Sequence, residues 1–240
     1  MTTSPRLAAR SVTVAVSSRT LLREVSLEVF PSEIVGVFGP SGAGKTTLFR
    51  VLVGEVAPSA GNVVLSGLDV TAMPLFERAR LGLGYLPQTP SVLADLTVRK
   101  NLAVFEALTR RVRPSVARDG LEVANEVGLS GLLDATASRL SGGERRRLEL
   151  GRALIASPSV LICDEPFAAV DPLGASHVGS LLRALADAGA AVLVADHHLE
   201  TALGICDRAV LLLEGEVALS ASPEEFREHP LVCSRYAAGV

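Results

Sequence analysis

The stretch EIVGVFGPSGAGKTTLFRVLVG, residues 33–54, decides the fold of this chain. Its apolar beginning, residues 33–39, is typical of a strand that is buried on both faces. Residues 45–54 carry apolar side chains at helical spacing and end in a glycine, which predicts a helix. Between the two lies G-x-x-x-x-G-K-S/T, the pattern of a loop that binds phosphate. The order strand, loop, helix is the setting that this pattern requires.

The residue types of this loop suit a triphosphate and a magnesium ion. Its glycines let backbone N–H groups face the phosphates, Lys45 can reach the β- and γ-phosphates, and the Thr46 hydroxyl can bind magnesium. Only Lys45 and Lys100 of the 23 basic residues are lysines, and arginine cannot replace a compact ammonium group. An ordinary glycine turn is the competing interpretation. The predicted nucleotide-binding residues are Gly39, Pro40, Ser41, Gly42, Ala43, Gly44, Lys45, Thr46 and Thr47.

Apolar runs and helical patterns alternate along much of the remaining chain. The runs GNVVLSG, LGYLPQ, VLICDEP, AAVLVAD and RAVLLLEGEVALSAS predict strands. Their alternation with helices predicts an α/β sheet with crossover connections. The EGE of the last run indicates a hairpin, and Ser222, Pro223 and Glu225 indicate the start of a C-terminal helix.

Residues 89–158 differ from the rest because strand patterns are absent from them. TVRKNLAVFEALTRR, residues 97–111, and SVARDGLEVANEVGL, residues 115–129, have helical patterns instead. We therefore expect a helical subdomain of residues 89–158, inserted into an α/β core made of residues 1–88 and 159–240.

Polar side chains follow three of the predicted strands. Asp164 and Glu165 come at the carboxyl end of a buried strand, where open α/β sheets bind ligands. We expect Asp164 to hold magnesium and Glu165 to orient and polarise the attacking water. His197 follows another strand and can reach the γ-phosphate, whereas His198 begins the next helix. Gln88 ends LGYLPQ, and its amide can reach magnesium and the water. Taken alone, each of these residues could simply cap a helix, pack in the core or stand in a turn. They predict an active site only in combination with the phosphate loop.

Residues 140–144 read LSGGE and predict a second anion site. Ser141 is expected to begin a helix, and the free N–H groups at a helix start bind phosphate. This helix start lies far along the chain from the phosphate loop. The basic run that follows, Arg145 to Arg147, is interpreted as a solvated helix face or as contacts to neighbouring subunits.

Composition excludes several classes of function. A net charge of −3 argues against a nucleic-acid partner. No run approaches the roughly 18 apolar residues of a membrane span, and the N-terminus lacks the apolar part of a signal peptide, so we expect a soluble, cytoplasmic chain. The scattered Cys163, Cys206 and Cys233 form neither a disulfide framework nor a metal-ligand pattern.

Together these motifs resemble the nucleotide-binding subunits of ABC transporters over nearly the whole chain. LSGGE is highly specific to that family as its signature. The other matches are Walker A at residues 39–46, the Q-loop glutamine Gln88, Walker B ending at Asp164, the catalytic Glu165, the D-loop AAVDP around Asp171 and the switch His197. The resemblance implies a P-loop NTPase core of the RecA-like type, with an antiparallel β subdomain and an inserted α-helical subdomain.

The resemblance also implies an activity, cofactors and partners. The activity is magnesium-dependent ATP hydrolysis by two copies of the chain packed head to tail. Ser141, Gly142 and Gly143 of one copy then face the γ-phosphate on the other copy's loop, and Asp171 lies in the shared site. Integral membrane permease subunits are the other partners, which places the chain on the cytoplasmic face of the inner membrane. A permease helix is expected to dock after Gln88, against Val92, Leu93 and Leu96, although those residues have an alternative role in packing the insertion.

Longer stretches, such as LSGGERRRLELGRAL and DEPFAAVDP, are similar to the ATPases of lipopolysaccharide export. Branched-chain amino-acid uptake ATPases are the nearest alternative. Soluble ABC ATPases usually carry two cassettes or a long coiled coil, which this chain lacks, and a small-molecule P-loop kinase leaves LSGGE unexplained. In one departure, Val16 stands where the family has an aromatic residue that stacks on adenine, so we expect loose base selectivity.

Overall fold

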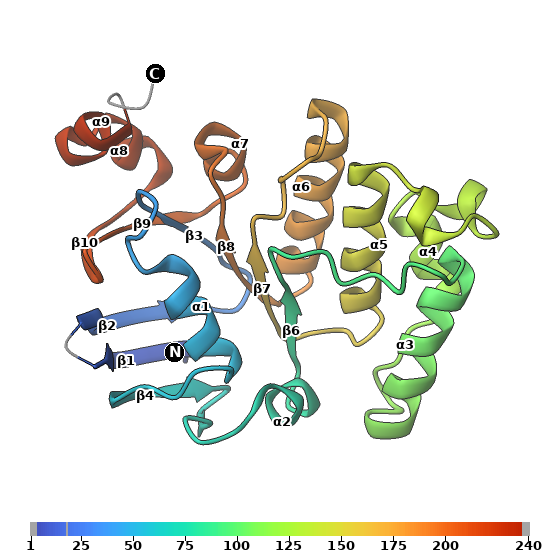
Figure 1. The fold of residues 1–240 in the computed structure, drawn as a ribbon, viewed down its shortest axis with the longest axis horizontal. Coiled ribbons are helices and arrows are strands. Elements are labelled where there is room, and N and C mark those ends of the chain that lie inside the picture. The colour runs from blue at the N-terminus through green and yellow to red at the C-terminus, as the bar shows by residue number, and fades with distance from the viewer. Residues whose placement is uncertain (1–3, 18, 237–240) are drawn as a thin grey trace.

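The computed structural model describes residues 4–17 and 19–236, which form two β-sheets with helices packed around them (Figure 1). The larger sheet has the strand order β10-β9-β3-β8-β7-β6. Its strands from β9 to β6 run parallel, and β10 joins the edge antiparallel to β9. The strands are β3 (Ile34–Phe38), β6 (Leu83–Leu86), β7 (Val160–Asp164), β8 (Ala191–Ala195), β9 (Arg208–Leu213) and β10 (Glu216–Ala221).

The smaller sheet is antiparallel and has the order β2-β1-β4-β5. Its strands are β1 (Leu7–Val16), β2 (Arg19–Val29), β4 (Ala60–Leu65) and β5 (Leu68–Asp69). Helix α1 (Lys45–Val53) packs its apolar face into the same core as this sheet.

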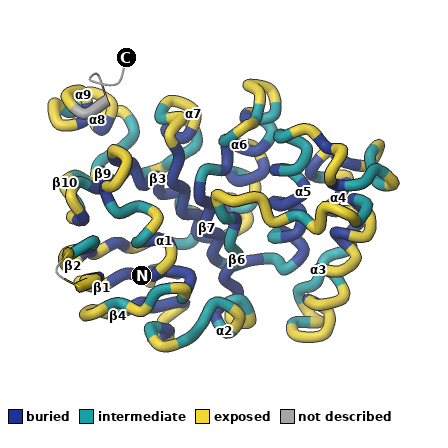
Figure 2. Tube along the Cα trace, viewed as in Figure 1, coloured by how far each residue is buried: buried dark blue, intermediate teal, exposed yellow. Residues whose placement is uncertain are grey.

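The central strands are buried (Figure 2). Alternate residues of these strands enter two different cores, one on each face of the sheet. On β7, Leu161 and Cys163 belong to the core shared with the helices, whereas Val160 and Ile162 belong to the core shared with α1 and the antiparallel sheet. This two-sided burial explains why the strand runs are almost continuously apolar.

Helices α5 (Gly142–Leu154) and α6 (Pro172–Asp187) pack against the side of the larger sheet opposite α1. Helices α3 (Val98–Val112) and α4 (Gly120–Glu126) pack on α5. Residues 89–158, all described, contain two short 3₁₀ turns (Ser130–Leu132 and Ala137–Arg139) and one isolated bridge but no strand. The second predicted helix, α4, is shorter than its pattern because the Asp119 carboxylate accepts hydrogen bonds from the N–H groups of Leu121 and Glu122 and so sets the first turn.

The helical segment is not a separate globule, because α3, α4 and α5 share one hydrophobic core with β7, β8 and α6. The α/β class, the antiparallel sheet and the helical insertion are therefore confirmed, while the boundaries at residues 88/89 and 158/159 stay a prediction. Within the described residues, no helix combines the length and apolar character needed to span a membrane.

The C-terminal elements follow the sequence pattern. The hairpin of β9 and β10 turns at Glu214 and Gly215, and Ser222 and Glu225 form a capping box at the start of α8 (Pro223–Glu228). The remaining helices are α2 (Leu75–Arg80), α7 (Leu199–Leu203) and α9 (Pro230–Tyr236).

Candidate active site

The loop between β3 and α1 has a backbone that only glycine allows at two positions. Gly39 and Gly44 have φ values of +153° and +108°. A Cβ atom on Gly39 would lie 2.2 Å from the carbonyl oxygen of Leu212, and one on Gly44 would lie 2.8 Å from Leu22. The loop therefore bends closely over its neighbours and leaves the start of α1, which has no side-chain cap, open toward the pocket.

Lys45 lies across this loop. Its Nζ donates hydrogen bonds to the carbonyl oxygens of Gly39 (2.6 Å) and Pro40 (3.1 Å). Burial lowers the pKa of Lys45, while the negative charges of Glu165 and Asp164 act in the opposite direction. The ammonium group is thus held over the loop, between the position expected for phosphates and two carboxylates.

Asp164 is the last residue of β7 and is paired with Ala195, the last residue of β8, so both strands end at the edge where the loop begins. The carboxyl group is buried, at 3 % exposure for the residue. Burial and, after it, the charge of Glu165 raise the pKa of Asp164 to about 6. A buried acid with a raised pKa, facing a pocket, is a position where a bound cation would be favourable.

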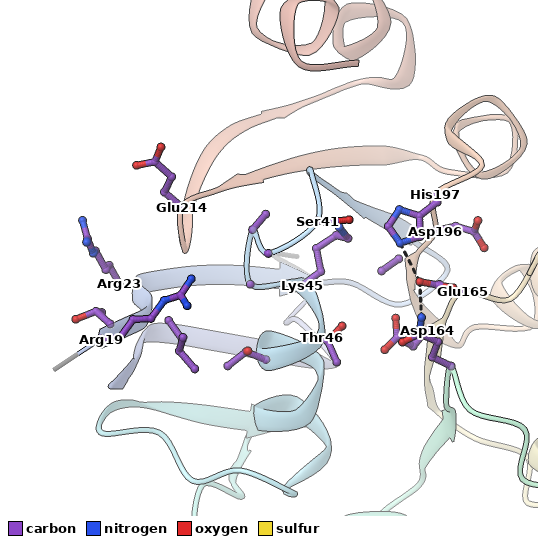
Figure 3. Close-up of a pocket in the computed structure, with 18 residues that line it drawn as sticks. Arg19, Arg23, Ser41, Lys45, Thr46, Asp164, Glu165, Asp196, His197 and Glu214 are labelled. Carbon is purple, nitrogen blue, oxygen red and sulfur yellow. Dashed lines mark hydrogen bonds and ion pairs between the residues drawn. The ribbon is translucent and has the colours of Figure 1, made fainter. Parts of the chain in front are cut away.

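Glu165 brings together two further segments. Its Oε1 accepts a hydrogen bond from Gln88 Nε2 at 2.8 Å and lies 2.9 Å from His197 Nε2, within the distance of an ion pair (Figure 3). The backbone of Glu165 has a φ of +53°, an uncommon conformation for a non-glycine residue that is often found at functional sites. His198 lies elsewhere, with its Nδ1 on the carboxylate of Asp196. The structure thus separates the two histidines as the sequence pattern predicts.

These residues line one pocket of about 700 Å³. The pocket extends from Glu165 and His197, across the phosphate loop, to the β1–β2 hairpin and to Glu214 (Figure 3). Of the predicted loop residues, Ser41 to Thr47 line it, whereas Pro40 and the glycine before it do not. Val16, at the position expected to stack on adenine, is also outside the lining.

The LSGGE segment and Asp171 lie outside this pocket. Ser141 caps α5 by accepting a hydrogen bond from the N–H of Glu144, and the Glu144 side chain accepts one from the N–H of Ser141. Gly142 packs so closely on the AAVDP loop that a Cβ atom would lie 2.5 Å from the Ala169 carbonyl oxygen. Asp171 caps α6. One chain therefore does not bring its own signature segment to its own phosphate loop.

Arg146 corrects the interpretation of the basic run as a solvated face. Its guanidinium is buried and donates to the carbonyl oxygens of Pro87 (2.7 Å), Asp164 (2.6 Å) and Glu165 (3.0 Å). It also forms a buried ion pair of 3.0 Å with Glu149. One side chain of α5 thus connects the segment before Gln88 to the end of β7. Arg146 stands four residues before Leu150 in the sequence, which places it on the apolar face of the helix. This spacing could have indicated that Arg146 is buried.

Asp196 is a second residue whose contribution the sequence pattern did not predict. Its side chain is 1 % exposed, and its Oδ2 accepts a hydrogen bond from the N–H of Phe167 at 2.9 Å. Asp196 therefore connects the loop that carries His197 to the loop that follows Glu165. The sequence shows that Asp196 stands at the end of an apolar strand. It does not show the hydrogen bond, because the partner is 29 positions away in the chain.

A second concave surface lies between α2, β6, α3 and α5. It is an apolar groove of about 790 Å³ whose lining includes Phe76, Phe105, Leu108 and Val112. We call it the α2–α3 groove. The predicted anchors Val92, Leu93 and Leu96 do not line it, because this segment folds back on α3, where Asn101 Oδ1 accepts a hydrogen bond from the N–H of Leu93. Among those three, Leu93 is exposed at 38 %.

The oxygen donors at the pocket fit a magnesium ion. The described residues contain no group of three or more His, Cys, Asp or Glu side chains arranged to hold a metal. Magnesium at a nucleotide site does not need such a group, because it takes one or two protein carboxylates together with phosphates and water. The Thr46 hydroxyl, the buried Asp164 carboxylate and the Gln88 amide provide that smaller set at the pocket.

A phosphate loop between a central parallel strand and a helix, with an acidic pair at the end of a nearby strand, defines a P-loop nucleoside triphosphatase. A family model described as ABC transporter matches residues 22–168. The chain is also 43 % identical to the lipopolysaccharide export ATP-binding protein LptB of Acidithiobacillus ferridurans, with 97 % of both chains covered. The corresponding protein of Escherichia coli K12 is 39 % identical over 91 % of both chains.

The chain therefore belongs to the ABC transporter family, and it is an ATP-hydrolysing, nucleotide-binding subunit. Among solved structures, it is similar to a nucleotide-free ATP-binding cassette from an ABC transporter, with a TM-score of 0.86 and 25 % identity over 97 % of this chain and 98 % of that one. The ADP-bound conformation of such a cassette has the same fold, with a TM-score of 0.85.

Proposed function

We propose that this chain hydrolyses ATP to drive lipopolysaccharide export. The observation that carries the proposal is the 43 % identity to a lipopolysaccharide export ATPase over 97 % of both chains. The match has no large unpaired insertion in either chain, so it extends through the helical segment and the α2–α3 groove, which are the parts that would contact a permease.

The positions of the site residues support a proposed role for each of them. Lys45 contacts the β- and γ-phosphates, and Glu165 orients and polarises the attacking water. Gln88 and His197 both contact the Glu165 carboxylate. We propose that ATP draws His197 to the γ-phosphate and frees that carboxylate for water. Magnesium, when bound by Thr46, Gln88 and Asp164, neutralises charge on the phosphates.

The hydrolytic site is shared between two copies of the chain. Ser141, which is exposed, and the half-buried Gly142 and Gly143 form the start of α5, outside their own pocket. A helix start with free N–H groups stabilises an anion that approaches it along the helix axis. We propose that this anion is the γ-phosphate held by a second copy, with Asp171 of the neighbouring loop inside the shared interface.

The membrane partner occupies the α2–α3 groove. Phe76, Leu108 and Val112 there are 58 %, 54 % and 49 % exposed, and apolar grooves of this kind receive amphipathic helices. We propose that a permease helix fills the groove, which holds the chain on the cytoplasmic face of the inner membrane. The groove lies between the α/β core and the helical segment, so closure around ATP would move its walls.

The test is to capture the tagged chain from its native membranes with its partners, and to reconstitute the complex in lipid vesicles. Lipopolysaccharide should stimulate its ATPase activity, and leucine, isoleucine and valine should not. Stimulation by those amino acids alone, with an amino-acid permease as the captured partner, would make this chain an uptake ATPase instead.

A further inference from the structure

We infer that the purine base of the bound nucleotide stacks on the guanidinium group of Arg19. The inference rests on the proposed placement of the triphosphate against Lys45 and Glu165. It assigns the base to a residue on the β1–β2 hairpin that no sequence motif marks.

The pocket has two chemically different ends. One end holds Lys45, Asp164 and Glu165, which set the position of the phosphates. The other end is formed by the β1–β2 hairpin through residues 19–21 and Arg23, together with Glu214. Because a triphosphate bound at the first end leaves the sugar and base to extend away from Glu165, the base must lie at the hairpin end (Figure 3).

No aromatic ring is available at that end. The residues that line the pocket, all within the described part of the chain, include neither Phe nor Tyr. Val16 is paired with Arg19 across the hairpin, is 57 % exposed and lies outside the lining. A flat group for the base must therefore come from another side chain, and a guanidinium is planar and stacks on π faces.

Arg19 is better placed for this than Arg23. Arg23 has an ion pair of 3.5 Å with Glu216. In the described part of the chain, the Arg19 guanidinium has neither a hydrogen bond nor an ion pair with any side chain or carbonyl. Figure 3 shows Arg19 extending toward the phosphate loop, whereas Arg23 and Glu214 extend away from it. Of the two arginines, Arg19 is thus the one whose guanidinium forms no ion pair and extends toward the phosphate loop.

Stacking on a guanidinium has a consequence for selectivity. The guanidinium contacts the π face of the base and does not contact the edge, where the bases differ. Every base has a π face. Arg19 therefore binds adenine and guanine alike, which agrees with the loose base selectivity expected from the valine at position 16.

The experiment measures dissociation constants by calorimetry for ATP, GTP and inorganic tripolyphosphate with the native chain, Arg19→Ala, Arg19→Lys and Arg10→Ala. Arg19→Ala should weaken ATP and GTP by about fivefold, the size of one exposed stacking contact, and leave tripolyphosphate unchanged. Arg19→Lys should recover only part of the loss because an ammonium has no planar face. Arg10→Ala is the matched control, because Arg10 is exposed on β1 of the same hairpin but does not line the pocket, and it should change little.

An equal loss of tripolyphosphate affinity in Arg19→Ala would overturn the inference, because Arg19 would then hold a phosphate. Unchanged ATP affinity, or complete recovery by Arg19→Lys, would overturn it as well. Failure of the native chain to bind either ATP or tripolyphosphate would instead contradict the proposed nucleotide site itself. Equal thermal melting of all four proteins excludes unfolding as the cause.

Discussion

Arg146 positions two parts of the active site at once, since it binds the carbonyl oxygens of Pro87, Asp164 and Glu165. We expect Arg146→Gln to lower kcat by more than about tenfold with little change in ATP affinity, because Arg146 does not line the pocket. The variant should also melt earlier, since Glu149 loses its buried partner. Steady-state kinetics and thermal melting measure the two effects.

The control is Arg145→Gln, at the half-buried neighbouring position, which should behave like the native chain. The double variant Arg146→Gln with Glu149→Gln removes the unpaired charge and should recover stability while kcat stays low. Recovery of kcat together with stability would show that Arg146 has only a structural role.

We expect the Asp164 carboxylate to lower the stability of the fold at neutral pH, although ATP hydrolysis requires it. Its pKa of about 6 lies above the ordinary value of 3.8, so the folded chain binds a proton that the unfolded chain releases between these values. Stability therefore falls as pH rises through that window. We expect Asp164→Asn to stabilise the nucleotide-free fold by up to about 3 kcal/mol at neutral pH, with the gain disappearing below about pH 4, and to abolish hydrolysis.

Chemical denaturation across this pH range, without nucleotide or magnesium, measures the prediction. A destabilised Asp164→Asn at neutral pH would mean that the carboxylate is favourably paired in the free chain.

The residues that the sequence could identify are those with a motif. The phosphate loop, Asp164, Glu165, His197 and Gln88 follow recognisable strands, and parallel strands bring their carboxyl ends to one edge. Arg146 and Asp196 could not be assigned, because their partners are backbone groups 18 and 29 positions away. A hydrogen bond to a backbone atom does not depend on the partner's side chain, so it leaves no pattern in the sequence.

At the scale of elements, the α2–α3 groove should separate assembly from hydrolysis. Leu108→Glu puts a charge on an exposed groove position, which would have to be desolvated when a partner helix docks. We expect the isolated variant to hydrolyse ATP nearly normally and to fail to copurify with the permease subunits. Leu121→Glu is the control, because Leu121 is 50 % exposed on α4 but does not line the groove. Equal copurification of both variants would exclude the groove as the docking surface.

The sequence predicted where helices start, because capping contacts are local. It did not predict which helices form the groove. Ser141 and Ser222 begin α5 and α8 as local hydrogen-bond acceptors, and such local contacts are readable from sequence. The groove combines α2 with α3, which are separated by β6 and a long loop. Packing between distant elements decided that Leu108 lines the groove while Leu93 does not.

At the scale of the whole molecule, a site shared between two copies requires a nucleotide-dependent dimer. Glu165→Gln keeps the shape of the side chain but cannot act as a base, so ATP should bind and persist. We expect size-exclusion chromatography of this variant to show a dimer with magnesium and ATP and a monomer with ADP. A monomer under both conditions, at concentrations that saturate the site, would count against the shared site.

In the proposed dimer, Lys45 and Ser141 serve the same nucleotide only when they come from different copies of the chain. The most direct test mixes Lys45→Ala with Ser141→Arg, an exposed substitution that obstructs the signature face, and measures ATP hydrolysis. Each variant alone should be almost inactive. Their mixed dimer contains one intact site, so an equal mixture should recover up to about a quarter of native activity. Full activity of Ser141→Arg on its own would contradict the account, since it would show that each chain completes its site without a partner.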